Sequence, residues 1–279
     1  PIQRMVWLFL LPTFAAFCIG FLYPFLKGAF LSFCKFKLTS QWTWVGFSNY
    51  VKAFSDSTFV HAFWYTALFA FVSVLFINVL AFAVAYFLTK GIKGSNLFRT
   101  VFFMPNLIGG IVLGYIWSMI FDGILVKYDT SVVLESKYGF WGLIILMCWQ
   151  QVGYMMIIYI AGLQSIPEDM LEAARIDGAT NWQMLWKVTI PNMMSSFTIC
   201  IFLTLTNGFK LFDQNLALTG GDPNHMTDMM ALNIYNTFYA RSGMQWKGYG
   251  QAKAVIFCAL VIFISLFQLR ATRSREVQQ

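Results

Sequence analysis

Residues 165–191 read SIPEDMLEAARIDGATNWQMLWKVTIP, a polar stretch that lies between two uncharged apolar runs, 138–166 and 188–209. Each run is long enough for a helix that crosses a bilayer, which needs about 20 apolar residues. The polar stretch is therefore expected to connect two membrane-spanning helices outside the membrane. The side of the membrane on which this stretch lies determines the sides of the other connecting segments.

Composition indicates a membrane protein, because the chain is 58% hydrophobic and 11% charged, whereas soluble domains carry about 25% charged residues. A final run, 254–269, is short, but residues 249–253 could extend it if the Lys253 side chain reaches the membrane surface. The sequence predicts an all-α protein with six transmembrane helices in a single domain over residues 1–279. The six uncharged runs are 5–26, 59–88, 100–121, 138–166, 188–209 and 254–269.

The first run is too long for the apolar core of a signal peptide and contains Pro12 and Tyr23, so a retained helix is expected. The five cysteines are dispersed and mostly lie in apolar runs, which favours neither a disulfide framework nor a metal site. His61 and His225 have no cluster of potential ligands near them in the sequence. No phosphate-binding loop of the G-x-x-x-x-G-K-[ST] type occurs, so the chain is not expected to be an enzyme.

The basic residues orient the chain, since Lys and Arg are denser on the cytoplasmic side. If both termini are cytoplasmic, nine of the 19 basic residues fall in inner segments, and ten are spread over outer segments of nearly twice that length. The density favours cytoplasmic termini and a cytoplasmic 165–191 stretch. The inner residues are Arg4, Lys90, Lys93, Arg99, Arg175, Lys187, Arg270, Arg273 and Arg275.

The first half of the polar stretch has the signals of a short helix. Ser165 and Glu168 have the spacing of a capping box, and Pro167 suits a first helical turn. Arg175 is expected in the last turn, followed by Gly178 as a left-handed stop. A rigid capped helix is therefore predicted here.

On that helix Met170 and Ala174 share one face, while Glu172 points away from both. A second short helix is expected to start from a cap at Thr180 or Asn181, and Pro191 to open the next spanning helix. The residues alone leave two interpretations open. The stretch is either an amphipathic loop at the lipid headgroups or a docking element for another protein.

The spacing Glu-Ala-Ala at 172–174, three residues, Gly178, nine residues and Val-Thr-Ile-Pro at 188–191 resembles a known signature. It is similar to the EAA motif, E-A-A-x3-G-x9-I-x-L-P, of permeases of ATP-binding-cassette (ABC) importers, with Val188 for Ile and Ile190 for Leu. Further segments resemble the carbohydrate, maltose-type branch of that family: WVGFSNYVKAF (44–54), NLFRTVFFMPN (96–106), GLQSIPEDMLEAARIDGA (162–179) and LTGGDP (218–223).

The resemblance implies a type I permease fold in a prokaryotic cell membrane, with residues 165–190 as cytoplasmic coupling helices that dock on ATPase subunits. It implies a second homologous permease in a heterodimer, two ABC ATPases that bind ATP and Mg²⁺, and an extracellular sugar-binding protein. No cofactor or nucleic acid is expected on this chain. The residues implied in ATPase coupling are Glu172, Ala173, Ala174, Asp177, Gly178 and Pro191.

A sugar site is predicted from two directions. Polar residues deep in spanning helices tend to face a cavity, which selects Gln150, Gln151, Tyr154, Thr204, Thr206, Asn207 and Asp213, with Trp149 able to stack on a sugar. The maltose-type resemblance places sugar contacts at Gln150, Gln151, Tyr154, Thr204, Gly208, Leu211 and Asp213. Gly208, Leu211 and Asp213 depart from the family's residues at these positions.

Other interpretations stay open. These Gln and Thr side chains could simply bond a neighbouring helix, and Lys210 with Asp213 is expected to form an interface salt bridge. An ion-coupled secondary transporter should show paired carboxylates within the membrane, which the runs lack. A permease for another solute, such as glycerol phosphate, is the second alternative. An anionic solute would call for an Arg in the cavity, and the predicted site contains none.

Overall fold

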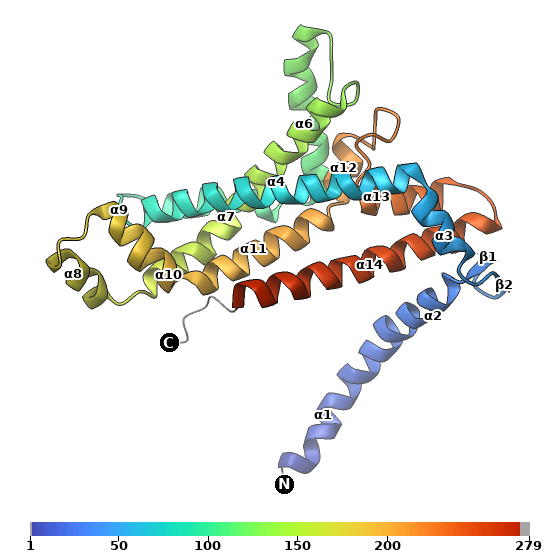
Figure 1. The fold of residues 1–279 in the computed structure, drawn as a ribbon, viewed down its shortest axis with the longest axis horizontal. Helices are drawn as coiled ribbons and strands as arrows, with labels where there is room; N and C mark the ends of the chain where they lie inside the picture. Colours follow the sequence, from blue (N-terminus) through green and yellow to red (C-terminus); the bar gives the residue numbers. More distant parts are fainter. Residues whose placement is uncertain (1, 274–279) are drawn as a thin grey trace. The chain divides into compact units, whose positions relative to one another are not determined.

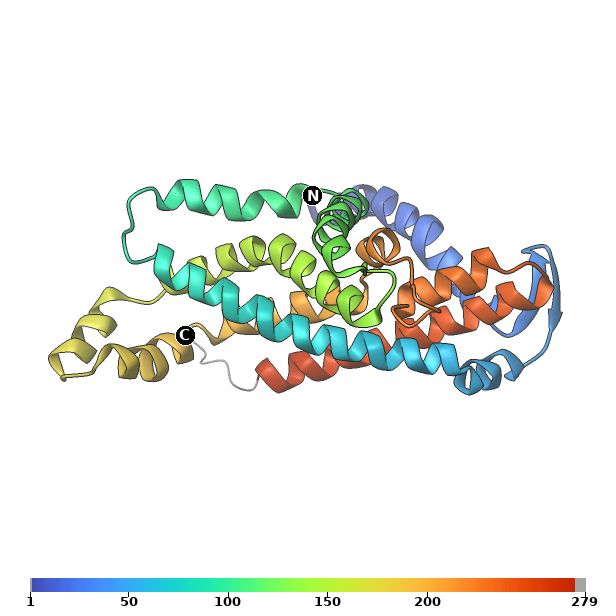
Figure 2. The ribbon, with the colours of Figure 1, turned by 90° about the horizontal axis from the view of Figure 1, so that it is seen from above.

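The structure is a computed structural model that describes residues 2–273, with side chains over 10–271. The described chain is mostly helical (Figures 1 and 2) and divides into two compact units. Among the described residues, one unit comprises 2–60 together with Asn233–Ala259, and the other comprises His61–Leu232 together with 260–273. The single permease domain over residues 1–279 stays a prediction.

Five helical segments of the described chain are long and apolar enough to cross a membrane, and a bent pair of helices makes a possible sixth. The bent pair, Asn181–Asn192 with Met194–Phe209, turns by 71°. The described segments confirm the predicted membrane protein, with up to six spans. The five are Leu10–Leu31, Ser57–Leu88, Gly110–Tyr128, Ser136–Gln164 and Met244–Ala271.

The first unit begins with a long helical segment and a small hairpin. Helix α1 (Ile2–Phe17) continues through a π-helical turn, η1 (Cys18–Leu22), into α2 (Tyr23–Leu31). Strands β1 (Cys34–Leu38) and β2 (Gln41–Trp44) then pair antiparallel, with Cys34 opposite Trp44. Helix α3 (Ser48–Ser55) follows, and its buried Asn49 donates hydrogen bonds to the carbonyls of Ser32 and Cys34. The hairpin is a short local addition that the all-α prediction did not contain.

Lys253 corrects a prediction within this unit. It lies in α14 (Met244–Arg273), and its side chain is fully buried rather than extended to the membrane surface. Its Nζ lies 2.9 Å from Asp56 Oδ2 and donates to Asn233 Oδ1 and Thr237 Oγ1 at 2.9 and 3.1 Å. Thr237 belongs to a π-helical turn, η5 (Asn236–Ala240). A buried cation needs an anion and hydrogen-bond acceptors, and this unit supplies both.

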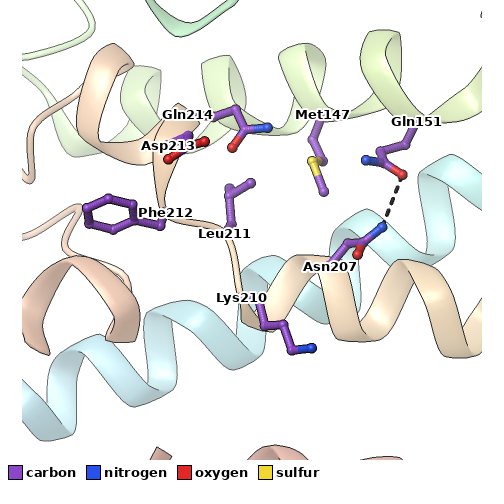
Figure 3. A pocket seen from close by; sticks show the side chains of 8 residues that line it. All are labelled: Met147, Gln151, Asn207, Lys210, Leu211, Phe212, Asp213 and Gln214. Carbon is purple, nitrogen blue, oxygen red and sulfur yellow. Dashed lines mark hydrogen bonds between the residues drawn. The ribbon is translucent and has the colours of Figure 1, made fainter. Parts of the chain in front are cut away.

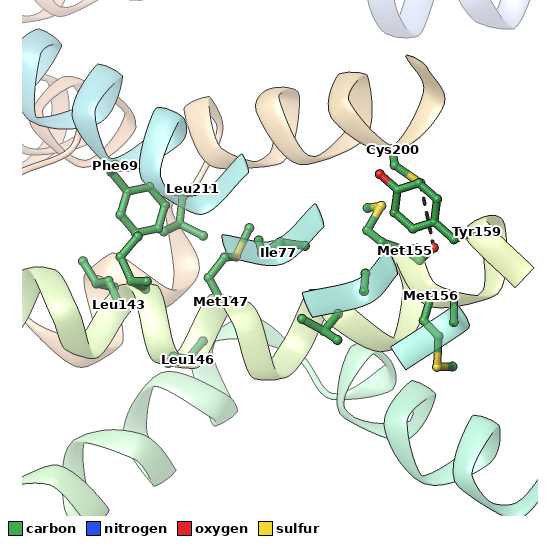
Figure 4. Close-up of a cluster of buried hydrophobic side chains, with 14 of the residues drawn as sticks. Phe69, Ile77, Leu143, Leu146, Met147, Met155, Met156, Tyr159, Cys200 and Leu211 are labelled. Atoms are coloured by element: carbon green, nitrogen blue, oxygen red, sulfur yellow. Dashed lines mark hydrogen bonds between the residues drawn. The ribbon is translucent and has the colours of Figure 1, made fainter. Parts of the chain in front are cut away.

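The second unit is built around three helices: α4 (Ser57–Leu88), α7 (Ser136–Gln164) and α11 (Met194–Phe209). Their shared core contains Phe69 and Ile77 of α4, Leu143, Met147 and Tyr159 of α7, and Cys200 of α11 (Figure 4). A polar chain crosses this core, because Tyr159 donates to Asn78 and Asn78 donates to Thr204. Buried polar groups in the membrane are thus satisfied between helices.

The third predicted span, 100–121, is not continuous. The structure has α5 (Ser95–Phe103), a 3-10 turn, η2 (Met104–Leu107), and then α6 (Gly110–Leu125) with the turn η3 (Val126–Tyr128). Pro105 lacks an N–H for the helical ladder, and two glycines, 109 and 110, follow it. The apolar composition hid this break, which separates α6 from α5.

Two short helices follow α11: α12 (Asp213–Leu218) and α13 (Met230–Tyr235). Helix α12 lies against α6 (Figure 2), where Gly114 is packed so closely on Ala217 that an added Cβ would sit 2.5 Å from the Ala217 Cβ. This contact holds the segment 210–214 beside the middle of α7.

Candidate functional sites

The polar stretch forms α8 (Glu168–Ile176), α9 (Asn181–Met184), a π-helical turn, η4 (Leu185–Thr189), and α10 (Ile190–Asn192). The predicted capping box at Ser165 and Glu168 is wrong. Ser165 is instead the C-cap of α7, and its hydroxyl donates to the Gly162 carbonyl. Pro167 occupies the N-cap of α8, where it has no side chain that accepts a hydrogen bond.

The other capping predictions for this stretch are confirmed. Arg175 lies in the last turn of α8, and Gly178 has φ +78°, the left-handed conformation that ends a helix. Thr180 caps α9, since its hydroxyl accepts from the Gln183 N–H while Gln183 Oε1 accepts from the Thr180 N–H. This reciprocal capping box makes the turn between the two helices rigid.

The residues that resemble the EAA motif lie on an accessible surface. Glu172, Ala173, Asp177 and Gly178 are exposed, and Ala174 is half-buried. Ile176 is 86% exposed and Trp182 is 68% exposed, so the surface also carries large apolar side chains. Exposed apolar groups rimmed by charge are typical of a protein interface. The periodicity argument placed the apolar face at Met170 and missed Ile176.

Pro191 does not open the spanning helix, which corrects the prediction. It lies in the three-residue α10, and the chain bends by 71° before α11 begins at Met194. The Met193 backbone, at φ −109° and ψ 22°, leaves the helical region at the bend. Segment 181–192 and α11 are therefore separate helical segments, joined by Met193.

A polar cavity of about 280 Å³ lies where α7 faces the segment between α11 and α12 (Figure 3). From α7 it is lined by Met147 and Gln151, and from the end of α11 by Asn207. The segment after α11 contributes the remaining walls. These are Lys210, Leu211, Phe212, Asp213 and Gln214.

Amide groups form the hydrogen bonds around this cavity. Asn207 Nδ2 donates to Gln151 Oε1 at 3.2 Å, a contact drawn in Figure 3. Gln214 Nε2 donates to Gln150 Oε1 at 2.7 Å, and Gln150 Nε2 reaches the Ile108 carbonyl at 3.3 Å. An amide can donate and accept, so these groups could exchange their mutual bonds for bonds to a hydroxylated ligand.

The predicted sugar-site residues divide into two groups. Gln151, Leu211 and Asp213 line the cavity, and Gln150 is bonded to the lining residue Gln214. Tyr154, Thr204 and Gly208 do not line it.

Each of these three residues faces another helix. Thr204 is fully buried, and its hydroxyl donates to the Cys200 carbonyl and accepts from Asn78. An added Cβ on Gly208 would lie 3.2 Å from the Ala70 Cα of α4, so this glycine serves helix packing. The ring of Tyr154 lies 6.4 Å from that of Phe103.

Sequence reasoning about a site missed Met147, Phe212 and Gln214 and assigned Lys210 a different role. In the described part of the chain no salt bridge joins Lys210 to Asp213. Lys210 is the C-cap of α11 and Asp213 begins α12, so their spacing of three does not place them on one helix face. Trp149 also lies outside the cavity wall, with its ring 5.6 Å from Trp117. Gln214 could have been selected as a polar residue next to Asp213.

Within residues 2–273 no group of three or more His, Cys, Asp or Glu residues is placed to hold a metal ion. His225 does have one carboxylate beside it, since Nδ1 lies 3.0 Å from Asp228 Oδ2. The His225 side chain is exposed and Asp228 is buried, and a single His–Asp pair is insufficient for a catalytic triad.

Comparisons with known proteins agree with this architecture. The chain is 40% identical over 280 residues to the probable starch degradation products transport system permease protein AmyD of Thermoanaerobacterium thermosulfurigenes, covering 98% of this chain and 95% of that protein. It is 32% identical over 281 residues to the multiple sugar-binding transport system permease protein MsmF of Streptococcus mutans, covering 97% and 96%.

A solved structure has the same fold. It is a bacterial alginate ABC transporter in complex with an alginate pentasaccharide-bound periplasmic protein, matched with a TM-score of 0.82 at 19% identity over 98% of this chain and 96% of that chain. Residues 77–276 match the family described as binding-protein-dependent transport system inner membrane component. The chain therefore belongs to this family of membrane transport permeases.

Proposed function

We propose that this chain is the membrane-spanning permease subunit of an ATP-driven importer for sugars or oligosaccharides. The observation that carries the proposal is the 40% identity, over nearly the whole chain, with a permease named for starch degradation products. The cavity supports it, because its amides at Gln151, Asn207 and Gln214 are neutral groups that suit hydroxyl ligands. Lys210 and Asp213 carry opposite charges, so the cavity wall favours no anion.

We infer that the two short helices α8 and α9 are the coupling element for separate ATPase subunits. Glu172, Ala173, Ala174, Asp177 and Gly178 lie on or next to the exposed face, and the capped turn between the helices can transmit force. Pro191 contributes through the bend that joins this element to α11. The ATPases would bind ATP and Mg²⁺, and this chain would bind no cofactor.

The inferred assembly contains a second, different permease, two ATPase subunits and an extracellular sugar-binding protein. Both termini and the coupling helices lie on the cytoplasmic side in this proposal, as the density of basic residues favours. ATP binding would close the ATPases and open the permease pair outward to the binding protein. Hydrolysis would return the pair to an inward-facing state.

Uptake by the assembled transporter tests the substrate class. Cells that express the full set of subunits should accumulate a labelled starch-derived oligosaccharide, and excess unlabelled oligosaccharide should compete while glycerol phosphate should not. The matched control is the same cells with an ATPase subunit that cannot hydrolyse ATP. Accumulation of glycerol phosphate in place of the oligosaccharide would reject a sugar as the substrate.

A further inference from the structure

An apolar groove of about 560 Å³ lies between α4, the turn η4 and α11, within the second unit. Its walls are almost entirely apolar, with Phe82, Leu185 and Phe197 among them. Its rim is open, since Leu75, Val79 and Trp186 are all more than half exposed. Asn78, a polar side chain in its wall, is already bonded to Tyr159, Thr204 and Val74. The groove therefore suits a hydrocarbon chain at membrane depth.

A second, polar pocket of about 510 Å³ lies at the end of α4, where the candidate membrane span Ser57–Leu88 ends. It is formed by the ends of α4 and α7 together with α8 and α9. Lys90 and Arg175 line it, and Glu168 supplies one opposing carboxylate. These three side chains leave the pocket with one net positive charge.

Tyr86 lies in the walls of both the groove and the pocket. The Lys90 Nζ lies 4.3 Å from the centre of the Tyr86 ring, so the cation is held at the boundary between the two. Segment 184–190 also faces both sides, with Met184 and Thr189 on the pocket and Leu185 and Ile190 on the groove. A ligand that fills both must be apolar at one end and carry about one negative charge at the other.

We propose that the groove and the pocket together bind one anionic phospholipid, with an acyl chain along α4 and α11 and the phosphate between Lys90 and Arg175. Basic pockets between spanning helices at the cytoplasmic surface bind anionic headgroups for the same electrostatic reason. The proposal rests on the orientation proposed above, which places this end of α4 in the cytoplasmic leaflet. A bound phosphate would connect α4 to the coupling helix α8.

Lipid retention by the assembled transporter tests the headgroup part. The complex is purified in detergent, stripped of lipid, and incubated with phosphatidylglycerol or phosphatidylcholine, and the retained lipid is counted by native mass spectrometry. The unaltered complex should retain phosphatidylglycerol in preference to phosphatidylcholine. Lys90→Ala should weaken phosphatidylglycerol binding about fivefold, the effect of one basic residue near a membrane surface.

Lys93→Ala is the matched control, because Lys93 is exposed in the same turn and does not line the pocket. The acyl chain is tested by Ala83→Trp, since Ala83 lines the groove and is half-buried. This variant should lower retention of both lipids. Ala67→Trp, also half-buried on α4 but outside the groove, should leave retention unchanged. If Ala83→Trp fails to assemble, the Lys90 comparison alone decides.

Three outcomes would overturn the proposal. Lys90→Ala could retain phosphatidylglycerol as well as Lys93→Ala does. Soluble glycerol phosphate could displace the bound lipid at equal concentration, which would mean that the pocket takes a free phosphate ester. A Val79→Cys variant could crosslink to the second permease in high yield, which would mean that a protein covers the groove. Retention is measured without ATP or sugar, so a failure of the proposed import activity leaves a different signature, normal lipid binding without uptake.

Discussion

Gly153 of α7 packs closely against the backbone of α5. An added Cβ there would overlap the carbonyl of Phe102, which is a backbone atom and cannot rotate away. We expect Gly153→Ala to lower the free energy of unfolding by about 1–3 kcal/mol, as overpacking does. Thermal unfolding of the purified protein would measure this change.

Gly123→Ala is the control for that substitution. Gly123 lies in α6 with no atom within 4 Å of an added Cβ, and alanine is the better helix former. Its melting temperature should stay the same or rise. An equal loss of thermal stability in Gly153→Ala and Gly123→Ala would show that the α5–α7 contact does not require a glycine.

Gly178 is constrained by its backbone rather than by space. Its φ is +78°, and an added Cβ would meet nothing within 4 Å. A β-branched residue is strained in this conformation by about 1–2 kcal/mol, whereas asparagine adopts it more readily. We therefore expect Gly178→Val to abolish uptake and to weaken ATPase association, and Gly178→Asn to retain both in part. Uptake and co-purification of the ATPase measure the difference, and equal activity of the two variants would contradict a conformational role.

At the scale of elements, the ion pair between Lys253 and Asp56 joins α14 to the start of α4. Asn233 and Thr237 also accept hydrogen bonds from the buried ammonium group. Removing one partner leaves the other charge without its counter-ion, so Lys253→Met should cost up to about 3 kcal/mol of stability. The double variant Lys253→Met with Asp56→Asn should recover part of that loss. A double variant less stable than Lys253→Met would show that the charges do not act as a pair.

Acid should weaken the ion pair between Lys253 and Asp56. Burial raises the pKa of Asp56, but hydrogen bonds from Tyr249, Lys253 and Thr58 outweigh it and hold the pKa below its ordinary value. Because the pKa is depressed in the folded state, the stabilisation is complete above the unfolded pKa of about 4 and is lost as pH falls below it. We expect the melting temperature to fall between pH 5 and pH 3, and to fall less in Asp56→Asn. Parallel pH profiles would exclude this carboxylate as the source.

At the scale of the whole molecule, the two candidate sites should separate in function. The polar cavity lies beside the middle of α7, whereas the coupling helices follow the end of α7. Glu172→Lys should abolish uptake and ATPase association with normal membrane insertion, because it reverses the charge on the exposed face of α8. Normal uptake in this variant would remove the coupling role from Glu172.

Gln151→Ala should lower sugar uptake with ATPase association unchanged, because its amide lines the cavity. Tyr154→Phe is the comparison, since Tyr154 lies outside the cavity wall, and its uptake should stay near that of the unaltered protein. Loss in Tyr154→Phe with no loss in Gln151→Ala would move the site away from this cavity. Transport assays with a membrane-insertion control would distinguish these results.

The features that could be predicted from the sequence are those set by neighbouring residues. Long apolar runs predict spanning helices because the transfer of a segment into the membrane depends on its own composition. Thr180 and Gly178 predict the turn between α8 and α9 because capping acts within one helical turn. The same local reasoning failed at Ser165, where the preceding helix α7 used the residue instead. It also failed at Pro105, where apolar neighbours concealed a break.

The amino-acid sequence by itself determined that this chain crosses a membrane, where most of its spans lie, and which polar stretch lies between them. Only the tertiary structure decided which polar residues share a cavity, since Gln150 and Gln214 are 64 residues apart, and which anion Lys253 meets, since Asp56 is 197 residues away. The physical reason is that hydrophobicity and capping act along the chain. Cavity walls and buried ion pairs instead depend on which helices pack together.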